Sequence, residues 1–127
     1  MKYLILLLFA ALLSGCVGGP EGPVVDLAQI DGWCIVVPDD STPAEKYAAE
    51  EFQRLYAGVS GKRLQIVDAA EPGASGRILI GQSAAADAES VSFRPSRYGP
   101  EDLRIVVAAN EIVIAGGRPR GALYGVY

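Results

Sequence analysis

The chain has 127 residues, the length of one ordinary domain, with 11 Lys and Arg, 15 Asp and Glu and a net charge of −4. It contains no His, which excludes a Ser-His-Asp or Cys-His nucleophile and an imidazole metal site. The negative charge argues against nucleic-acid binding, whose affinity comes mainly from Lys and Arg on phosphates, and two Cys are too few for a disulfide scaffold.

The first residues, MKYLILLLFAALLSGC, are typical of a cleaved leader. Lys2 supplies a positive charge, and the apolar run Tyr3–Leu13 is shorter than the ~20 residues that a membrane-spanning helix needs. The next residues, LSGC, resemble the lipobox of bacterial lipoproteins. That resemblance implies a signal peptide over residues 1–15 and a lipid on the thiol of Cys16. An ordinary secretory signal with a chance cysteine is the alternative.

Residues 16–32 begin with a Gly/Pro mixture, GGPEGP, that cannot hold a helix or strand interior. We expect a tether between the lipid and a domain over residues 33–127. A lipid on Cys16 would fix the protein to the membrane of a bacterial cell envelope, outside the cytoplasm, at the outer membrane or cell surface. Cys34 then has no partner, and we expect a buried thiol in a strand.

The domain opens with a predicted strand over Trp33–Val37, followed by a strong helix start. Thr42 can cap the helix, Pro43 fits its first position, and Glu45 completes a capping box. Gly58 or Gly61 can end it. Its apolar stripe is expected at Ala44, Ala48, Phe52, Leu55 and Val59. The opposite, solvent-facing side is expected at Glu45, Lys46, Glu50, Gln53 and Arg54, with an ion pair between Glu50 and Arg54.

Further strands are predicted over residues 64–67 and 77–81, the second buried on both faces, then a short helix over 83–88 and an irregular segment over 92–100. A hairpin is predicted from residues 103–108 and 112–115, with its turn at Asn110, because Asn tolerates a positive φ. Pro119 is expected to start a last helix. This order predicts an α+β fold in which helices pack on a mixed β-sheet.

The adjacent acidic pairs are not expected to form a glycosidase dyad, whose carboxyl groups lie ~5–9 Å apart across a sugar. Neighbours on a strand or helix point apart. Asp39 and Asp40 precede the first predicted helix, and their negative charge is expected to interact favourably with its N-terminus. The adjacent acidic pairs are Asp39-Asp40, Glu101-Asp102 and Glu50-Glu51, the last of which is expected on the solvent-facing side of the helix.

The segment GGRPRG, residues 116–121, is either an anion-binding turn or a strand-to-helix turn. The second interpretation is favoured, with Arg118 and Arg120 exposed or contacting a further domain. Tyr124 and Tyr127 could stack on a sugar, as could Tyr98, but their helical spacing favours packing or contacts between domains. No catalytic, metal-binding or cofactor-binding residue is assigned.

The segment LRIVVAANEIVIAGGRPRGALYGVY, residues 103–127, resembles the end of the N-terminal domain of several glycoside hydrolases. The similar groups are the α-glucuronidases, the family-20 β-N-acetylhexosaminidases and a related bacterial group. Earlier segments agree in order: VVP at 36–38, PAEKYAAEEF at 43–52 and RILIG at 77–81. The resemblance covers residues 33–127 and implies a small accessory domain, like domain 2 of the hexosaminidases.

In those families the domain precedes a (β/α)₈ barrel that carries the catalytic carboxylates. The resemblance implies a non-catalytic part of a lipid-anchored hydrolase, whose barrel would lie beyond residue 127 and bind the carbohydrate substrate. Apolar Leu123, Val126 and Tyr127 are expected to be exposed without that barrel. The alternatives are a complete, lipid-anchored module that binds a glycan or protein, and an independent small hydrolase, which the composition disfavours.

Overall fold

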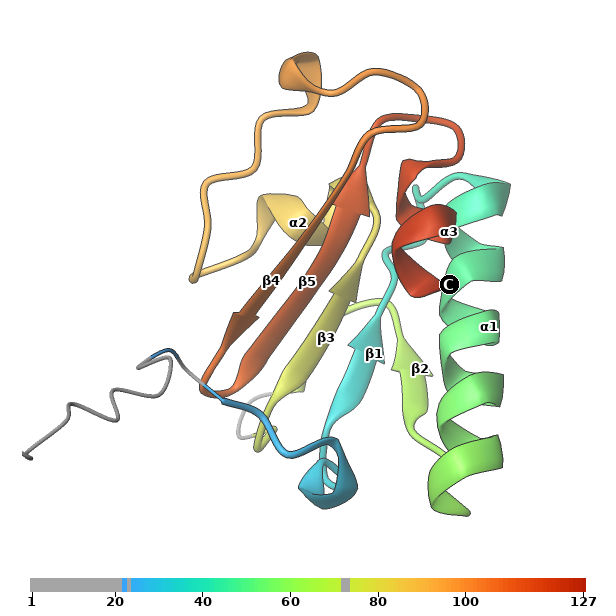
Figure 1. The fold of residues 1–127 in the computed structure, drawn as a ribbon, viewed down its shortest axis with the longest axis vertical. Coiled ribbons are helices and arrows are strands. Elements are labelled where there is room, and N and C mark those ends of the chain that lie inside the picture. Colours follow the sequence, from blue (N-terminus) through green and yellow to red (C-terminus); the bar gives the residue numbers. More distant parts are fainter. Residues whose placement is uncertain (1–21, 23, 72–73) are drawn as a thin grey trace, which may run out of the picture.

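The computed structural model describes residues 22, 24–71 and 74–127. The predicted signal peptide over residues 1–15 and the predicted lipid site at Cys16 lie outside these residues. The described residues form a five-stranded mixed sheet with helices on both faces (Figure 1). The predicted α+β class with helices packed on a mixed sheet is therefore confirmed.

The strands lie in the order β2-β1-β3-β5-β4. β1, β2, β3 and β5 run parallel, and β4 pairs antiparallel with β5 at one edge of the sheet. β3 and β5 are almost wholly buried, as expected of central strands covered on both faces. The strand bounds are β1 Cys34–Val36, β2 Gln65–Val67, β3 Arg77–Ile80, β4 Leu103–Ala108 and β5 Glu111–Gly116.

Helix α1, Pro43–Ser60, begins with the predicted capping box. The Thr42 side chain accepts a hydrogen bond from the Glu45 N–H, and the Glu45 carboxylate accepts one from the Thr42 N–H. The helix ends at Gly61, whose φ of 71° lies in the left-handed region that glycine adopts without strain. Both termini of α1 were therefore predicted correctly.

The predicted faces of α1 are partly wrong. Glu45 and Glu51, expected in solvent, are 2% and 8% exposed, while Val59, expected in the core, is 92% exposed. The cause is tertiary: Ala48 and Ala49 make the close contact with the sheet, and the two glutamates turn towards partners elsewhere in the fold. Arg54 accordingly pairs with Glu51 at 2.8 Å rather than with Glu50.

Two apolar cores lie on the two faces of the sheet. Helices α1 and α3 (Gly121–Val126) cover one face, and α2 (Gln82–Ala86) covers the other. Ile30 belongs to the first core at 2% exposure, and a 3₁₀ turn at Leu27–Gln29 precedes it. Packed structure thus begins before residue 33, inside the segment interpreted as a tether.

The hairpin forms as predicted, but its loop is Ala109–Asn110, and no described residue other than glycine has a positive φ. The reason given for the turn, a left-handed Asn110, is therefore wrong. The last helix starts later than predicted, at Gly121, and Pro119 lies in the turn over residues 118–120 that precedes it. In the predicted irregular segment, Pro95–Arg97 makes one 3₁₀ turn.

Candidate functional site

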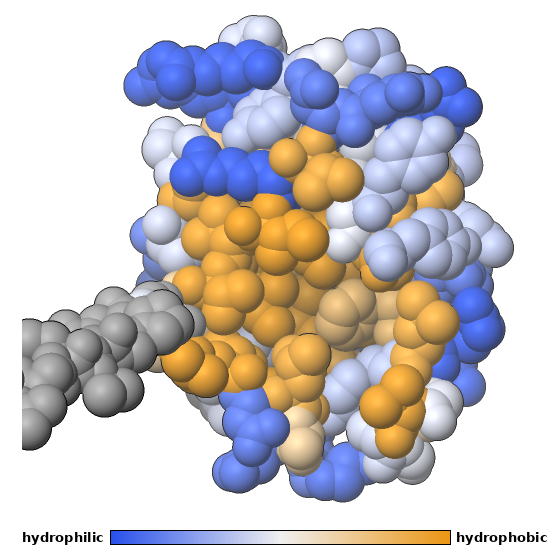
Figure 2. Space-filling model, in the orientation of Figure 1, coloured by the Kyte–Doolittle hydropathy of each residue, from blue (hydrophilic) through white to orange (hydrophobic). Residues whose placement is uncertain are grey.

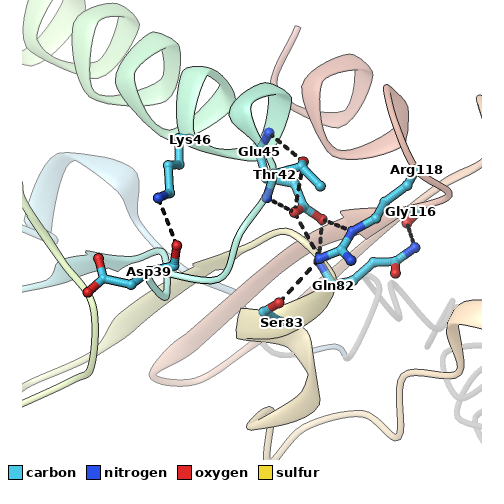
Figure 3. Close-up of polar contacts among 8 residues, drawn as sticks. All are labelled: Asp39, Thr42, Glu45, Lys46, Gln82, Ser83, Gly116 and Arg118. Carbon is cyan, nitrogen blue, oxygen red and sulfur yellow. Dashed lines mark hydrogen bonds and ion pairs between the residues drawn. The ribbon is translucent and has the colours of Figure 1, made fainter.

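Parallel strands β1, β3 and β5 end together at one edge of the sheet, beside the first residues of α1 and α2. The helices that follow β1 and β3 lie on opposite faces, so the chain departs in opposite directions from these two neighbours. Such a crevice at the carboxyl ends of strands is where open α/β sheets commonly bind ligands. Polar side chains from α1, α2 and the β5–α3 connection meet in this crevice (Figure 3).

The carboxylate of Glu45 occupies this crevice. Its Oε2 accepts hydrogen bonds from the Thr42 N–H at 2.8 Å and from Arg118 Nη2 at 3.1 Å. Its Oε1 accepts one from the Gln82 N–H at 2.8 Å (Figure 3). Arg118 Nη2 also donates to Ser83 Oγ at 3.2 Å. One side chain of α1 thereby joins the start of α2 and the β5–α3 connection.

Burial alone would raise the pKa of Glu45, but the hydrogen bonds from Gln82, Thr42 and Arg118 outweigh it and lower that pKa. The carboxylate is thus ionised and already holds the donors that an anionic ligand would need. A Cβ at Gly81 would lie 2.8 Å from its Cδ, so the space is filled. We conclude that this cluster, which we call the Glu45 cluster, stabilises the fold rather than binding substrate.

Arg118 and Arg120, predicted to be exposed or to contact a further domain, are exposed, and each is paired with a glutamate of this domain. Arg118 binds Glu45, and Arg120 binds Glu101 at 3.0 Å and lies over the Tyr124 ring at 6.0 Å. The GGRPRG segment is therefore a strand-to-helix turn, as favoured. Asp39 lies before α1, and its backbone oxygen accepts a hydrogen bond from Lys46 Nζ at 2.8 Å.

A second buried carboxylate lies at the opposite end of the sheet, at the start of β5. Glu111 is 3% exposed and accepts hydrogen bonds from the backbone of Glu89 and Ser90 and from Arg77 Nε at 2.9 Å. These donors outweigh its burial and lower its pKa. Glu111 thus ties the segment after α2 to the sheet. Sequence reasoning missed it because a single Glu beside a turn carries no signal for burial.

The third buried carboxylate, Glu51, lies between α1 and α3. Arg54 donates to it through Nε and Nη2, and the hydroxyl of Tyr127 donates at 2.9 Å. These bonds lower the pKa of Glu51 to about 2 and raise the pKa of Tyr127 to about 12. Tyr127 is nevertheless 70% exposed, so it is less a packing residue than its spacing suggested.

A large apolar surface is exposed on one face of the molecule (Figure 2). Three side chains of edge strand β4 contribute to it, and they lie on the face that α1 and α3 cover elsewhere. They are Leu103 at 42% exposure, Ile105 at 50% and Val107 at 40%. We call them the β4 apolar row.

An apolar groove of about 360 Å³ lies on the same side, between α1, the end of α3 and the 3₁₀ turn at Leu27–Gln29. It is lined by Leu27, Ala28, Phe52, Leu55, Tyr56, Val59, Ser60 and Val126. Leu123 and Val126, expected to be exposed, are half-buried against the core. An exposed apolar surface was thus predicted, but it lies mostly on α1 and β4 rather than on the last helix.

In the part of the chain that the structure describes, no group of three or more His, Cys, Asp or Glu residues is able to hold a metal ion. The three buried carboxylates in the described residues are each held by hydrogen-bond donors. Burial raises the pKa of the Cys34 thiol, and a less ionised thiol is a poorer nucleophile. Tyr98 stacks on Phe93, with ring centroids 4.8 Å apart.

No protein-family model, curated protein or solved structure matches the chain. In residues 22, 24–71 and 74–127, none of the helices has the length and apolar character needed to cross a membrane.

The lowered pKa values of Glu45, Glu51 and Glu111 predict a distinct pH dependence of stability. A carboxyl group with a lowered pKa in the folded state stabilises the fold above its unfolded pKa, and this stabilisation is lost as the pH falls through the folded pKa. Because the chain has no His, we expect a constant melting temperature between about pH 5.5 and 7.5. Below the ordinary value of 4.5 it should fall steadily towards pH 2.

Thermal melts followed by circular dichroism across this range would check that prediction. The Glu51→Gln variant should lose part of the acid dependence, because its side chain no longer titrates. A melting temperature that rises on acidification from pH 5 to 3 would contradict the assignment of these three groups as stabilising carboxylates.

Proposed function

We propose that the chain is the non-catalytic N-terminal module of a lipid-anchored glycoside hydrolase acting in carbohydrate degradation. The observation that carries the proposal is the uncovered apolar surface, which consists of the β4 apolar row and the adjoining groove. Exposed apolar areas of this kind mark sites of protein contact. The resemblance of residues 33–127 to hydrolase accessory domains supports the same proposal.

The module would act by bracing a catalytic barrel carried by the same polypeptide, and the barrel would bind and cleave the carbohydrate. Burial of apolar surface is worth about 25 cal/mol per Å², so covering the β4 apolar row would hold the two parts together. The finer fold assignment, to the domain-2 type of the hexosaminidases, belongs to this proposal. No catalytic residue, metal or cofactor is assigned to the module.

A lipid on Cys16 would place the module at the extracytoplasmic side of the bacterial envelope, at the outer membrane or cell surface. The support is the sequence alone: the leader over residues 1–15 and the LSGC motif. Metabolic labelling with a radioactive fatty acid should mark the wild-type chain and not Cys16→Ser. Equal labelling of both would contradict the anchor, and a processed but unlabelled wild-type chain would favour an ordinary secretory signal.

The apolar surface predicts strong binding of a hydrophobic fluorescent dye. We expect Ile105→Glu and Val107→Glu each to lower dye fluorescence to about half, because each puts a charge in the β4 apolar row. Arg104→Glu is the matched control, because Arg104 lies on the same strand and points to the opposite face. Equal dye binding by the wild type, Ile105→Glu and Arg104→Glu would show that this surface is not available for docking.

Reading the coding sequence beyond the codon for Tyr127 tests the proposal as a whole. A continuous frame that encodes a (β/α)₈ barrel with paired carboxylates is the expected result. A stop codon at that point would overturn it in favour of a complete module that binds a glycan or protein. Exposed tyrosines on α1 and α3 are the observation that favours that second function. Glycosidase turnover by the purified chain would instead support an independent hydrolase.

A further inference from the structure

Three exposed tyrosines gather where α1 and α3 lie side by side. Tyr47 on α1 is 49% exposed, and Tyr124 and Tyr127 from α3 and its C-terminal end are 40% and 70% exposed. Tyr127 contacts Glu51 on α1, one helical turn after Tyr47, and the Tyr47 hydroxyl contributes to the raised pKa of Tyr127. We call these three residues the tyrosine ridge.

Ionic side chains fix the ridge in place. The Tyr127 hydroxyl donates a hydrogen bond to Glu51 at 2.9 Å. Glu51 also accepts hydrogen bonds from Nε and Nη2 of Arg54. Arg120 is paired with Glu101 and lies over the ring of Tyr124. Rings held in this way lose little conformational freedom on binding, which favours affinity. Arg54 is 65% exposed at its side chain, and none of the hydrogen bonds in the described part of the chain uses its Nη1.

The charges around the ridge identify the class of ligand. Glu51 pairs with Arg54, and Glu101 pairs with Arg120, so the positive and negative charges beside the rings balance. Aromatic platforms for single-stranded nucleic acid combine stacking with a strongly positive groove, and this protein has a net charge of −4. An uncharged ligand with flat C–H faces and many hydroxyl groups fits the ridge better.

We propose that the tyrosine ridge binds a neutral carbohydrate chain. The C–H face of one sugar ring would pack on Tyr124 and that of another on Tyr127, while Arg54 Nη1 donates a hydrogen bond to a ring hydroxyl. The ridge is separate from the β4 apolar row, so the proposal does not depend on the chain being part of a hydrolase. In either context the ridge would hold polysaccharide beside the anchored protein.

Calorimetric titration of the purified full chain with cellohexaose and with chitohexaose tests the proposal. We expect binding of at least one of the two. Tyr124→Ala should weaken that binding about tenfold through loss of ring contact, whereas Tyr124→Phe, which keeps the ring, should stay within about twofold. Tyr98→Ala is the matched control, because Tyr98 stacks on Phe93 away from the ridge and its loss should leave the affinity unchanged. Circular dichroism melts of each variant would separate lost binding from lost folding.

The absence of binding by both oligosaccharides at millimolar concentration would overturn the proposal, as would equal loss of binding in Tyr98→Ala and Tyr124→Ala. Tighter binding of a thymidine oligonucleotide than of either sugar would overturn it in favour of a nucleic-acid platform. None of these results bears on the dye-binding test of the apolar surface, so failure here is distinguishable from failure of the proposed function.

Discussion

Replacing Glu45 by Ala is expected to lower the free energy of unfolding by about 2–4 kcal/mol, because it removes a helix cap and takes the carboxylate acceptor from partly buried donors. The Thr42 N–H, the Gln82 N–H and Arg118 all lose their acceptor at once. Such a loss is a large fraction of the ~5–15 kcal/mol by which natural domains are stable. Urea unfolding followed by circular dichroism would measure it.

Two further variants sharpen this prediction. Glu50→Ala removes a carboxylate from an exposed position on the same helix and should change stability by less than about 0.5 kcal/mol. Glu45→Gln keeps an acceptor oxygen but loses the charge opposite Arg118, so its effect should fall between the two. Equal stability of Glu45→Ala and Glu50→Ala would show that the Glu45 cluster does not stabilise the fold.

Replacing Gly117 by Ala is expected to cost about 2–3 kcal/mol, because overpacking against backbone cannot be relieved by a rotamer change. A Cβ at Gly117 would collide with the backbone oxygen of Gly99. The close approach brings the segment before β4 against the β5–α3 connection, where the Gly117 N–H donates to the Asp102 oxygen at 2.9 Å. Denaturant unfolding and proteolysis of this segment would both report the change.

Gly58→Ala is the matched control. Gly58 lies near the end of α1 with nothing within 4 Å of an added Cβ, so the substitution should stabilise the protein by about 0.5–1 kcal/mol through higher helix propensity. Opposite signs for the two Gly→Ala changes are therefore expected. Equal effects at both positions would contradict the tight packing of the β5–α3 connection.

Local signals in the sequence predicted most of the secondary structure. Thr42, Pro43 and Glu45 mark the start of α1, Gly61 marks its end, and β-branched runs mark the strands. These features act between residues close in the chain, where propensity and capping decide the outcome. The α+β class follows from the order of such elements.

Long-range contacts account for what the sequence did not predict. Glu45 is buried because of Gln82 and Arg118, which lie 37 and 73 residues away and show no relation to it in the sequence. The burial of Glu51 likewise depends on Tyr127, 76 residues away. Helical periodicity assigns charged residues to solvent unless a distant partner is known. The faces of α1, and the position of Tyr47 beside Tyr127, could therefore be recognised only from the structure.

The central claim is that a catalytic domain docks on the uncovered apolar face. Hydrogen exchange at the amides of β4 tests this claim most directly. Amide exchange rates would be compared between this chain and the longer polypeptide encoded when the reading frame is continued beyond the codon for Tyr127. The account predicts that the amides of Leu103–Ala108 exchange about tenfold more slowly in the longer polypeptide, because the docked domain covers them. Equal exchange rates at these positions in both forms would contradict it.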